Sequence, residues 1–129
     1  LSAMPWDEFL DAYRRAIAGA VDRLADNRFA VWVIGEVRAP SGSCRGLVPA
    51  TVQAFEDAGA ALHNDAVLVT PTGSLALRAA RIFVPGRRLG RSHQYVLVFV
   101  KGNAEKAVEA CGSLADLDLA LPTTALEGD

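Results

Sequence analysis

Five arginines and a histidine lie in a stretch of the chain, residues 71–94, that contains no aspartate or glutamate. They are Arg78, Arg81, Arg87, Arg88, Arg91 and His93. Charges of both signs are interspersed on most protein surfaces, so an unbalanced cluster of cations favours a polyanion, whose phosphates each add affinity that falls with salt. These residues therefore predict a polyanion partner. The alternative is that the arginines pair with acids elsewhere, such as those of the first helix or of the acidic end of the chain.

A second polar group follows the first predicted strand. It consists of Arg38, Ser41 and Arg45, in a loop rich in serine and glycine. Ligands of open α/β sheets bind beyond the carboxyl ends of the strands, so this loop is a candidate part of a binding site. Gly42 and Gly46 do not form a phosphate-binding P-loop, because no Gly-Lys-Ser/Thr follows them, and they are interpreted as turn residues.

Catalytic and metal chemistry have little support in the sequence. His63 and His93 are thirty residues apart and belong to no set with metal-ligand spacing. Ser92 and His93 are neighbours on an extended segment, where side chains point to opposite faces, so they do not form a nucleophile and base. Glu36, near a strand end, is a candidate general base, although a solvated or arginine-paired carboxylate is the simpler interpretation. No catalytic residue and no metal site is assigned.

Length and composition are those of an ordinary globular domain. The chain has 129 residues, 51% of them apolar, and a net charge of −2, which fits one packed domain. Residues 38–94 carry seven arginines against three acids, giving +4, whereas the segments before and after carry −2 and −4. No apolar run approaches the roughly 20 residues of a membrane span, and no signal sequence is recognised. We therefore expect a cytoplasmic location.

The cysteines and the first residue give two further expectations. Cys44 and Cys111 are 67 positions apart and belong to no Cys/His cluster, so the sequence allows one disulfide but favours reduced thiols. The chain begins at Leu1 rather than Met, which indicates processing or a piece of a longer protein.

Hydrophobic periodicity predicts the elements that must position these residues. Apolar residues at helical spacing predict the first helix, and two apolar, β-branched runs, 29–37 and 66–70, predict strands covered on both faces. The predicted elements in order are a helix over 5–24, a strand over 29–37, a helix over 47–58, strands over 66–70 and 95–100, and a short helix over 104–111. Residues 71–94 are predicted to form a long loop.

This order of elements predicts an α/β fold with flanking helices. The strand-helix-strand unit predicts two parallel strands joined by a right-handed crossover, and the third strand, reached without a helix, is expected to return antiparallel. Three strands make a thin sheet with an exposed edge, which suggests a missing half. We expect residues 1–112 to form this domain and residues 113–129 to form an acidic, flexible tail or to pack on a partner.

Several short blocks between residues 1 and 112 match a known family in their order and spacing. The blocks are Trp6-Asp-Glu-Phe-Leu10, Phe29-Ala-Val-Trp-Val-Ile-Gly-Glu-Val-Arg38, Arg45-Gly-Leu47, Ala54-Phe-Glu-Asp-Ala-Gly59, Asn64, Leu68-Val-Thr-Pro71, Gly73-Ser74, Arg88-Leu-Gly-Arg91 and His93-Gln-Tyr-Val-Leu-Val-Phe-Val-Lys-Gly102. With them the chain resembles the carboxy-terminal part of adenine-specific DNA methylases of actinobacteria and their phages.

The resemblance implies a Rossmann-like methyltransferase sheet of seven strands, of which this chain supplies the last three, with the final strand inserted antiparallel. It implies that the parent enzyme moves a methyl group from S-adenosylmethionine to an exocyclic amine of a flipped-out base. The partner of the arginine-rich loop would then be DNA. The missing amino-terminal half, or a second copy of the chain, would be a further partner.

The sequence departs from this family where the family's chemistry is done. The 129 residues contain neither an Asp/Asn-Pro-Pro-aromatic loop, which holds the target amine, nor a glycine-rich strand-to-helix turn, which holds the cofactor. We therefore expect the DNA-facing half of a methyltransferase, which binds no cofactor alone and is inactive without the missing portion. The alternative is a non-enzymatic relic that acts as a nucleic-acid-binding or assembly module.

Overall fold

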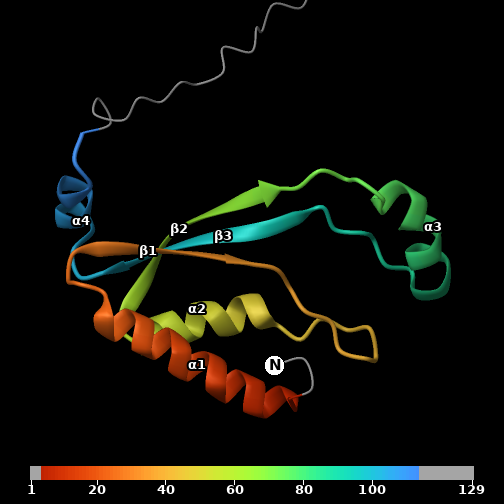
Figure 1. Ribbon diagram of the computed structural model, residues 1–129, viewed down its shortest axis with the longest axis horizontal. Coiled ribbons are helices and arrows are strands. Elements are labelled where there is room, and N and C mark those ends of the chain that lie inside the picture. Colours follow the sequence, from red (N-terminus) through yellow and green to blue (C-terminus); the bar gives the residue numbers. More distant parts are fainter. Residues whose placement is uncertain (1–3, 114–129) are drawn as a thin grey trace, which may run out of the picture.

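The computed structural model describes residues 4–113, which form four helices and a three-stranded sheet (Figure 1). The helices are α1 (Trp6–Arg23), α2 (Leu47–Asp57), α3 (Leu75–Gly86) and α4 (Ala104–Cys111), and the strands are β1 (Arg28–Ile34), β2 (Ala60–Val69) and β3 (His93–Lys101). The first, second and last helices were expected from the sequence and are confirmed. Residues 114–129, nearly all of the predicted acidic tail, lie outside the described residues. No described helix is long and apolar enough to cross a membrane.

β3 lies between β1 and β2 and pairs antiparallel with both, so the strand order is β1-β3-β2. The prediction of two parallel strands plus one antiparallel strand is therefore wrong, because the described sheet is wholly antiparallel. β1 and β2 run in the same direction, but β3 separates them and takes the hydrogen bonds that each would offer the other. Strands joined by a helix are often neighbours; here a later strand has been inserted between them.

α1 and α2 cover one face of the sheet (Figure 1), and the core lies between these helices and the sheet. The apolar stripe of α1 recurs every three or four residues, which turns Ile17 and Val21 toward this core. Phe55 of α2 stacks on Phe99 of β3 with the ring centroids 3.8 Å apart. Both rings are almost completely buried, so this stack fixes α2 against the middle of the sheet.

A chain of hydrogen bonds joins α1, β1 and α2 inside this core. Nε1 of Trp32 donates to the hydroxyl of Tyr13 at 2.8 Å, and that hydroxyl lies 2.9 Å from Oγ1 of Thr51. Oγ1 of Thr51 donates in turn to the backbone oxygen of Leu47 at 2.7 Å. The hydroxyl of Tyr13 therefore donates to Thr51 and accepts from Trp32. Each polar atom of the network has a partner, as burial requires.

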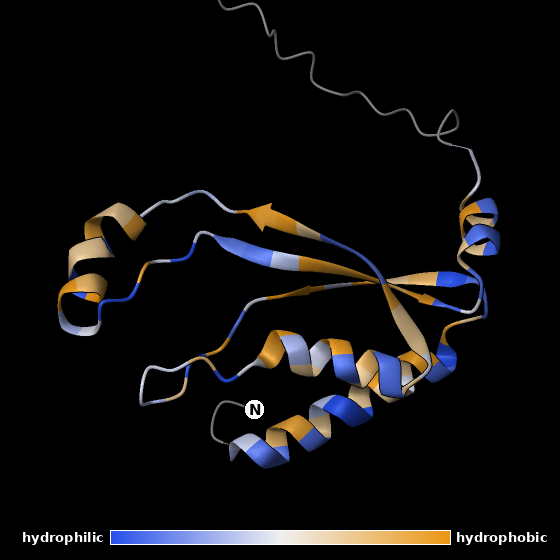
Figure 2. Ribbon diagram, turned by 180° about the vertical axis from the view of Figure 1, so that it is seen from behind, coloured by the Kyte–Doolittle hydropathy of each residue, from blue (hydrophilic) through white to orange (hydrophobic). Residues whose placement is uncertain are grey.

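The other face of the sheet is largely open. Val31 and Val33 of β1 are 60% and 49% exposed, and every residue of β2 after Ala60 is exposed. Figure 2 colours several segments of the strands as hydrophobic, and α4 packs beside β1 and β3 at one end of the sheet. The prediction of strands covered on both faces is therefore wrong. An apolar strand sequence signals that cover is needed, but α1 and α2 supply it on one face.

Residues 71–94 are not one long loop, as the sequence predicted, because α3 occupies their centre. α3 projects from the ends of β2 and β3, away from α1 and α2 (Figure 1). It ends at Gly86 and is capped by Arg87, which takes a left-handed φ of 48° and donates its N–H to the carbonyl of Phe83 at 2.7 Å. No residue of α3 is buried. Pro85 and Gly86, residue types that are common in loops, lie inside this helix, and its exposed apolar residues, among them Leu77 and Val84, add no buried face to the core.

Replacing Tyr13 with Phe should lower the free energy of unfolding by about 1–3 kcal/mol, because the indole N–H of Trp32 would lose its acceptor inside the core. Urea denaturation measures this loss. Tyr95→Phe is the matched control, because the Tyr95 ring also packs against the core while its hydroxyl has no hydrogen-bond partner within residues 4–113. Equal losses in the two variants would contradict a stabilising role for the network.

Candidate nucleic-acid interface

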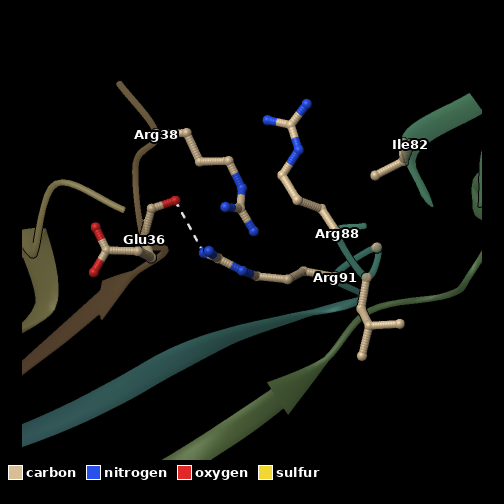
Figure 3. A pocket seen from close by; sticks show the side chains of 7 residues that line it. Glu36, Arg38, Ile82, Arg88 and Arg91 are labelled. Atoms are coloured by element: carbon tan, nitrogen blue, oxygen red, sulfur yellow. Dashed lines mark hydrogen bonds between the residues drawn. The ribbon is translucent and has the colours of Figure 1, made fainter. Parts of the chain in front are cut away.

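A cleft of about 380 Å³ lies beyond the carboxyl end of β1, beside the segment that leads into β3. Its walls come from the residues after β1, from α3 and from the segment between α3 and β3. The lining residues are Glu36, Arg38, Ile82, Arg88, Leu89, Gly90 and Arg91. Three arginines singled out in the sequence thus meet in one place (Figure 3), although Arg38 precedes Arg88 by 50 positions.

Arg91 ties the two sides of the cleft together. Its Nη1 donates to the backbone oxygen of Glu36 at 3.2 Å, and its Nη2 donates to Sγ of Cys44 at 3.2 Å. Cys44 lies in a hairpin-like loop, within which Nη1 of Arg38 donates to the carbonyl of Gly42 at 2.9 Å. Both cysteines of the chain are free thiols. The two guanidinium groups are held by neutral acceptors, so their positive charges remain uncompensated.

The carboxylate of Glu36 points away from these arginines (Figure 3) and binds the amino-terminal end of α2. Its Oε1 accepts from the backbone nitrogens of Val37 and Leu47, each at 2.9 Å. α2 starts after Gly46, which has no side chain to cap it, so this carboxylate takes the place of a cap at the positive end of the helix. Partial burial raises the pKa of Glu36, but the backbone donors, Leu47 first among them, outweigh burial and lower the pKa below its usual 4.5. Glu36 is therefore a poor general base at neutral pH.

Two glycines, Gly42 and Gly86, lie close to the guanidinium of Arg88. A Cβ on Gly42 would lie 2.8 Å from its Nη1, and a Cβ on Gly86 would lie 2.5 Å from its Nε. Nε of Arg88 is buried and has no hydrogen-bond partner. The absence of side chains at both glycines therefore allows the guanidinium of Arg88 to lie between α3 and the hairpin of Arg38.

No carboxylate neutralises the arginines of the cleft or of α3 within the described part of the chain. The ion pairs of residues 4–113 are Arg14 with Asp11 and Lys101 with Asp26. The acids of α1 are therefore not partners of the arginine cluster, which was one form of the alternative interpretation. The acids of the carboxy-terminal tail, the other form, lie outside the described residues.

Of the six predicted DNA-binding residues in 71–94, four lie outside the lining of the cleft. Arg78 and Arg81 are exposed on α3. Arg87 follows α3 with its guanidinium 5.5 Å from the ring centroid of Phe83. His93 is the first residue of β3, and its ring contacts the ring of Tyr95 in the same strand. Fewer of the side chains that the sequence grouped together therefore line the cleft than was predicted.

The loop after β1 places Arg45 and Ser41 on a neighbouring cavity or at its border. This second cavity, of about 460 Å³, shares Arg38 with the cleft and is lined by the aromatic rings of the start of α1. The guanidinium of Arg45 lies over the ring of Trp6, 4.7 Å from its centroid. Oγ of Ser41 lies 2.8 Å from Oγ of Ser43, so this hydroxyl is engaged within the loop.

Sequence reasoning missed two features of the site. The first is the capping role of Glu36, for which one signal was present: α2 begins after a glycine and has no acid in its first turn, so its free N–H groups needed an acceptor from elsewhere. The second is the contact of Arg88 with Gly42 and Gly86. No local signal predicts it, because it depends on how α3 and the hairpin meet.

The comparisons with known proteins show a similarity of fold and nothing further. The structure is similar to that of a candidate DNA modification methylase from Thermus thermophilus, with a TM-score of 0.59 and 18% sequence identity over 76% of this chain. The match spans 38% of the methylase chain, so the present chain corresponds to part of a methylase-like fold. No family model and no curated protein matches the sequence.

Replacing Glu36 with Gln should lower the free energy of unfolding by about 1 kcal/mol at neutral pH, because an amide interacts less favourably than a carboxylate with the positive end of α2. Folding lowers the pKa of Glu36, so its stabilisation is fully present above the usual 4.5 and is lost as the pH falls through the folded-state value.

Urea denaturation of both proteins from neutral to acid pH should therefore show a stability difference that closes in acid. Asp65→Asn, which removes an exposed carboxylate from β2, is the control and should show a smaller difference. A pH-independent difference for Glu36→Gln would contradict the charge-based explanation.

Proposed function

We propose that this chain is the DNA-facing part of a DNA methyltransferase of the adenine-specific type. The parent enzyme transfers a methyl group from S-adenosylmethionine to an exocyclic amine of a base, and this part binds the DNA. Two findings support the proposal. The structure is methylase-like over 38% of a longer methylase chain, and the sequence blocks named above carry the finer resemblance to adenine-specific enzymes.

The observation that carries DNA binding is the set of arginines without carboxylate partners within residues 4–113. Arginine binds phosphate oxygens through two parallel N–H donors and keeps its charge at any physiological pH. When such a surface binds DNA, its guanidinium groups replace the counter-ions condensed on the phosphates, and the release of those ions favours binding. Arg78 and Arg81 extend this positive surface along α3, away from the body of the domain.

The residues of this chain do not fit the methyl donor. S-adenosylmethionine carries a sulfonium, an amino group and a carboxylate and is positive overall, so the three guanidinium groups of the cleft beyond β1 repel more of its charge than they attract. The carboxylate in the lining, that of Glu36, is bonded to the amino-terminal end of α2 and turned away. We therefore assign cofactor binding and catalysis to the portion of a methylase that this chain does not match.

A second candidate is a non-enzymatic module that binds nucleic acid or joins an assembly. The observation that favours it is the open face of the sheet, on which Val31 and Val33 stand exposed. An apolar sheet face of this kind is normally covered by another structure. Both candidates share the arginine surface and differ in whether methyl transfer follows when the missing portion is supplied.

Replacing Arg87, Arg88 and Arg91 together with Ala should weaken binding to a short DNA duplex and reduce the slope of log affinity against log salt by up to about 3, one counter-ion per lost contact. Fluorescence anisotropy over a series of salt concentrations measures both quantities. Arg14, Arg15 and Arg23, exposed on α1, replaced together with Ala, remove the same charge elsewhere and should leave the slope nearly unchanged.

Equal slopes in the two triple variants would show that the arginine surface is not the site of DNA binding. Calorimetry with S-adenosylmethionine on the same protein tests the division of labour between this chain and the missing portion. Heat of binding at a single site would show that the cofactor is assigned to the wrong part of the parent enzyme.

A further inference from the structure

The cleft beyond β1 concentrates positive charge without a compensating acid. Arg38, Arg88 and Arg91 all line it, and the carboxylate of Glu36 is bonded to backbone N–H groups of α2 instead. Repulsion between like charges raises the free energy of such an arrangement most strongly where the surface is partly enclosed. A bound anion would relieve this repulsion, so the anion-bound cleft is favoured over the empty cleft.

Two of the three guanidinium groups are also oriented by hydrogen bonds before any ligand arrives. Arg91 is fixed by Glu36 and Cys44, and Arg38 is fixed by Gly42, in each case through bonds that use part of a guanidinium's five N–H donors. Arg88 makes no hydrogen bond to another described residue, and its guanidinium lies close to Gly42 and Gly86. Donors that are held in place lose little conformational entropy when an anion binds.

We propose that the cleft is a phosphate site, in which Arg38, Arg88 and Arg91 together bind one phosphodiester group of DNA. The phosphate chemistry follows from the cleft itself, whereas DNA as its source rests on the function proposed above. Arg38 comes from the hairpin after β1, and the other two arginines come from the segment between α3 and β3. One bound phosphate therefore links both segments and places the DNA backbone at the carboxyl end of β1.

Phosphate binding at this site requires Arg88 to keep its position, whereas nonspecific electrostatic attraction does not. Gly86→Ala tests this requirement without changing the charge. The new Cβ would lie 2.5 Å from Nε and 3.0 Å from Nη2 of Arg88 and would displace the Arg88 side chain. Gly86 has no left-handed φ, so alanine fits the backbone there. Gly35→Ala is the matched control, because its Cβ would meet nothing within 4 Å.

The experiment is a titration of the full ¹⁵N-labelled chain with inorganic phosphate and, separately, with a short DNA duplex, following the arginine Nε–H signals by NMR. Signals of Arg38, Arg88 and Arg91 should shift with both ligands, while those of Arg15 and Arg23 on α1 stay in place. Gly86→Ala should weaken phosphate binding roughly tenfold, which corresponds to about one charge-assisted hydrogen bond. Gly35→Ala should leave phosphate binding unchanged.

The two titrations separate failure of the site from failure of the proposed function. If the duplex binds with a salt-dependent affinity but phosphate moves none of the three signals, the site is overturned and DNA binding stands. If phosphate shifts the signals and the duplex does not bind, the phosphate site stands and DNA is excluded as its ligand. Equal phosphate affinity in the Gly86→Ala variant and the unmutated chain would overturn the role of Arg88.

Discussion

The antiparallel pairing of β3 with both β1 and β2 is the constraint on which the candidate site depends. The register sets Tyr95 opposite Ile34 and opposite Val67. Because Arg91 lies four residues before Tyr95 and Glu36 lies two residues after Ile34, the pairing brings their segments together at one end of the sheet. The bond from Arg91 to the carbonyl of Glu36 is a consequence of that register. A slip by one residue would turn the side chains of β3 to the opposite faces and would separate the two sides of the cleft.

Charge in the cleft is arranged by helix capping as much as by the arginines. α2 begins without a side-chain cap, and Glu36 supplies the missing acceptor from the end of β1. The same bond that stabilises α2 removes the carboxylate from the reach of Arg38 and Arg91. Fold stability and the positive charge of the surface are thus linked through one side chain, since a free Glu36 carboxylate would neutralise part of the cluster.

The sheet has an open apolar face, and the similar methylase chain is matched over only part of its length. The similar methylase structure is matched over 38% of its length, and the apolar residues of β1 and β2 are exposed where a complete α/β sheet is covered on both faces. Apolar strand residues that face solvent cost little while they are few, but a continuous apolar face favours association. The strands therefore carry a sequence suited to more cover than residues 4–113 supply.

Helices and strands with a local or periodic hydrophobic pattern could be predicted from the amino-acid sequence alone. The stripe from Trp6 to Leu24 identified α1, and the apolar runs identified the three strands, although β2 begins six residues earlier than its apolar core suggested. The sequence also grouped the arginines, because a shortage of acids can be read without coordinates. Tertiary structure alone decided the strand order, because β3 can pair with two strands only after all three have met. It also decided which arginines converge, since Arg38 reaches the other two through the β1–β3 register, and it assigned Glu36 to α2, because a cap supplied from eleven residues away leaves no local pattern.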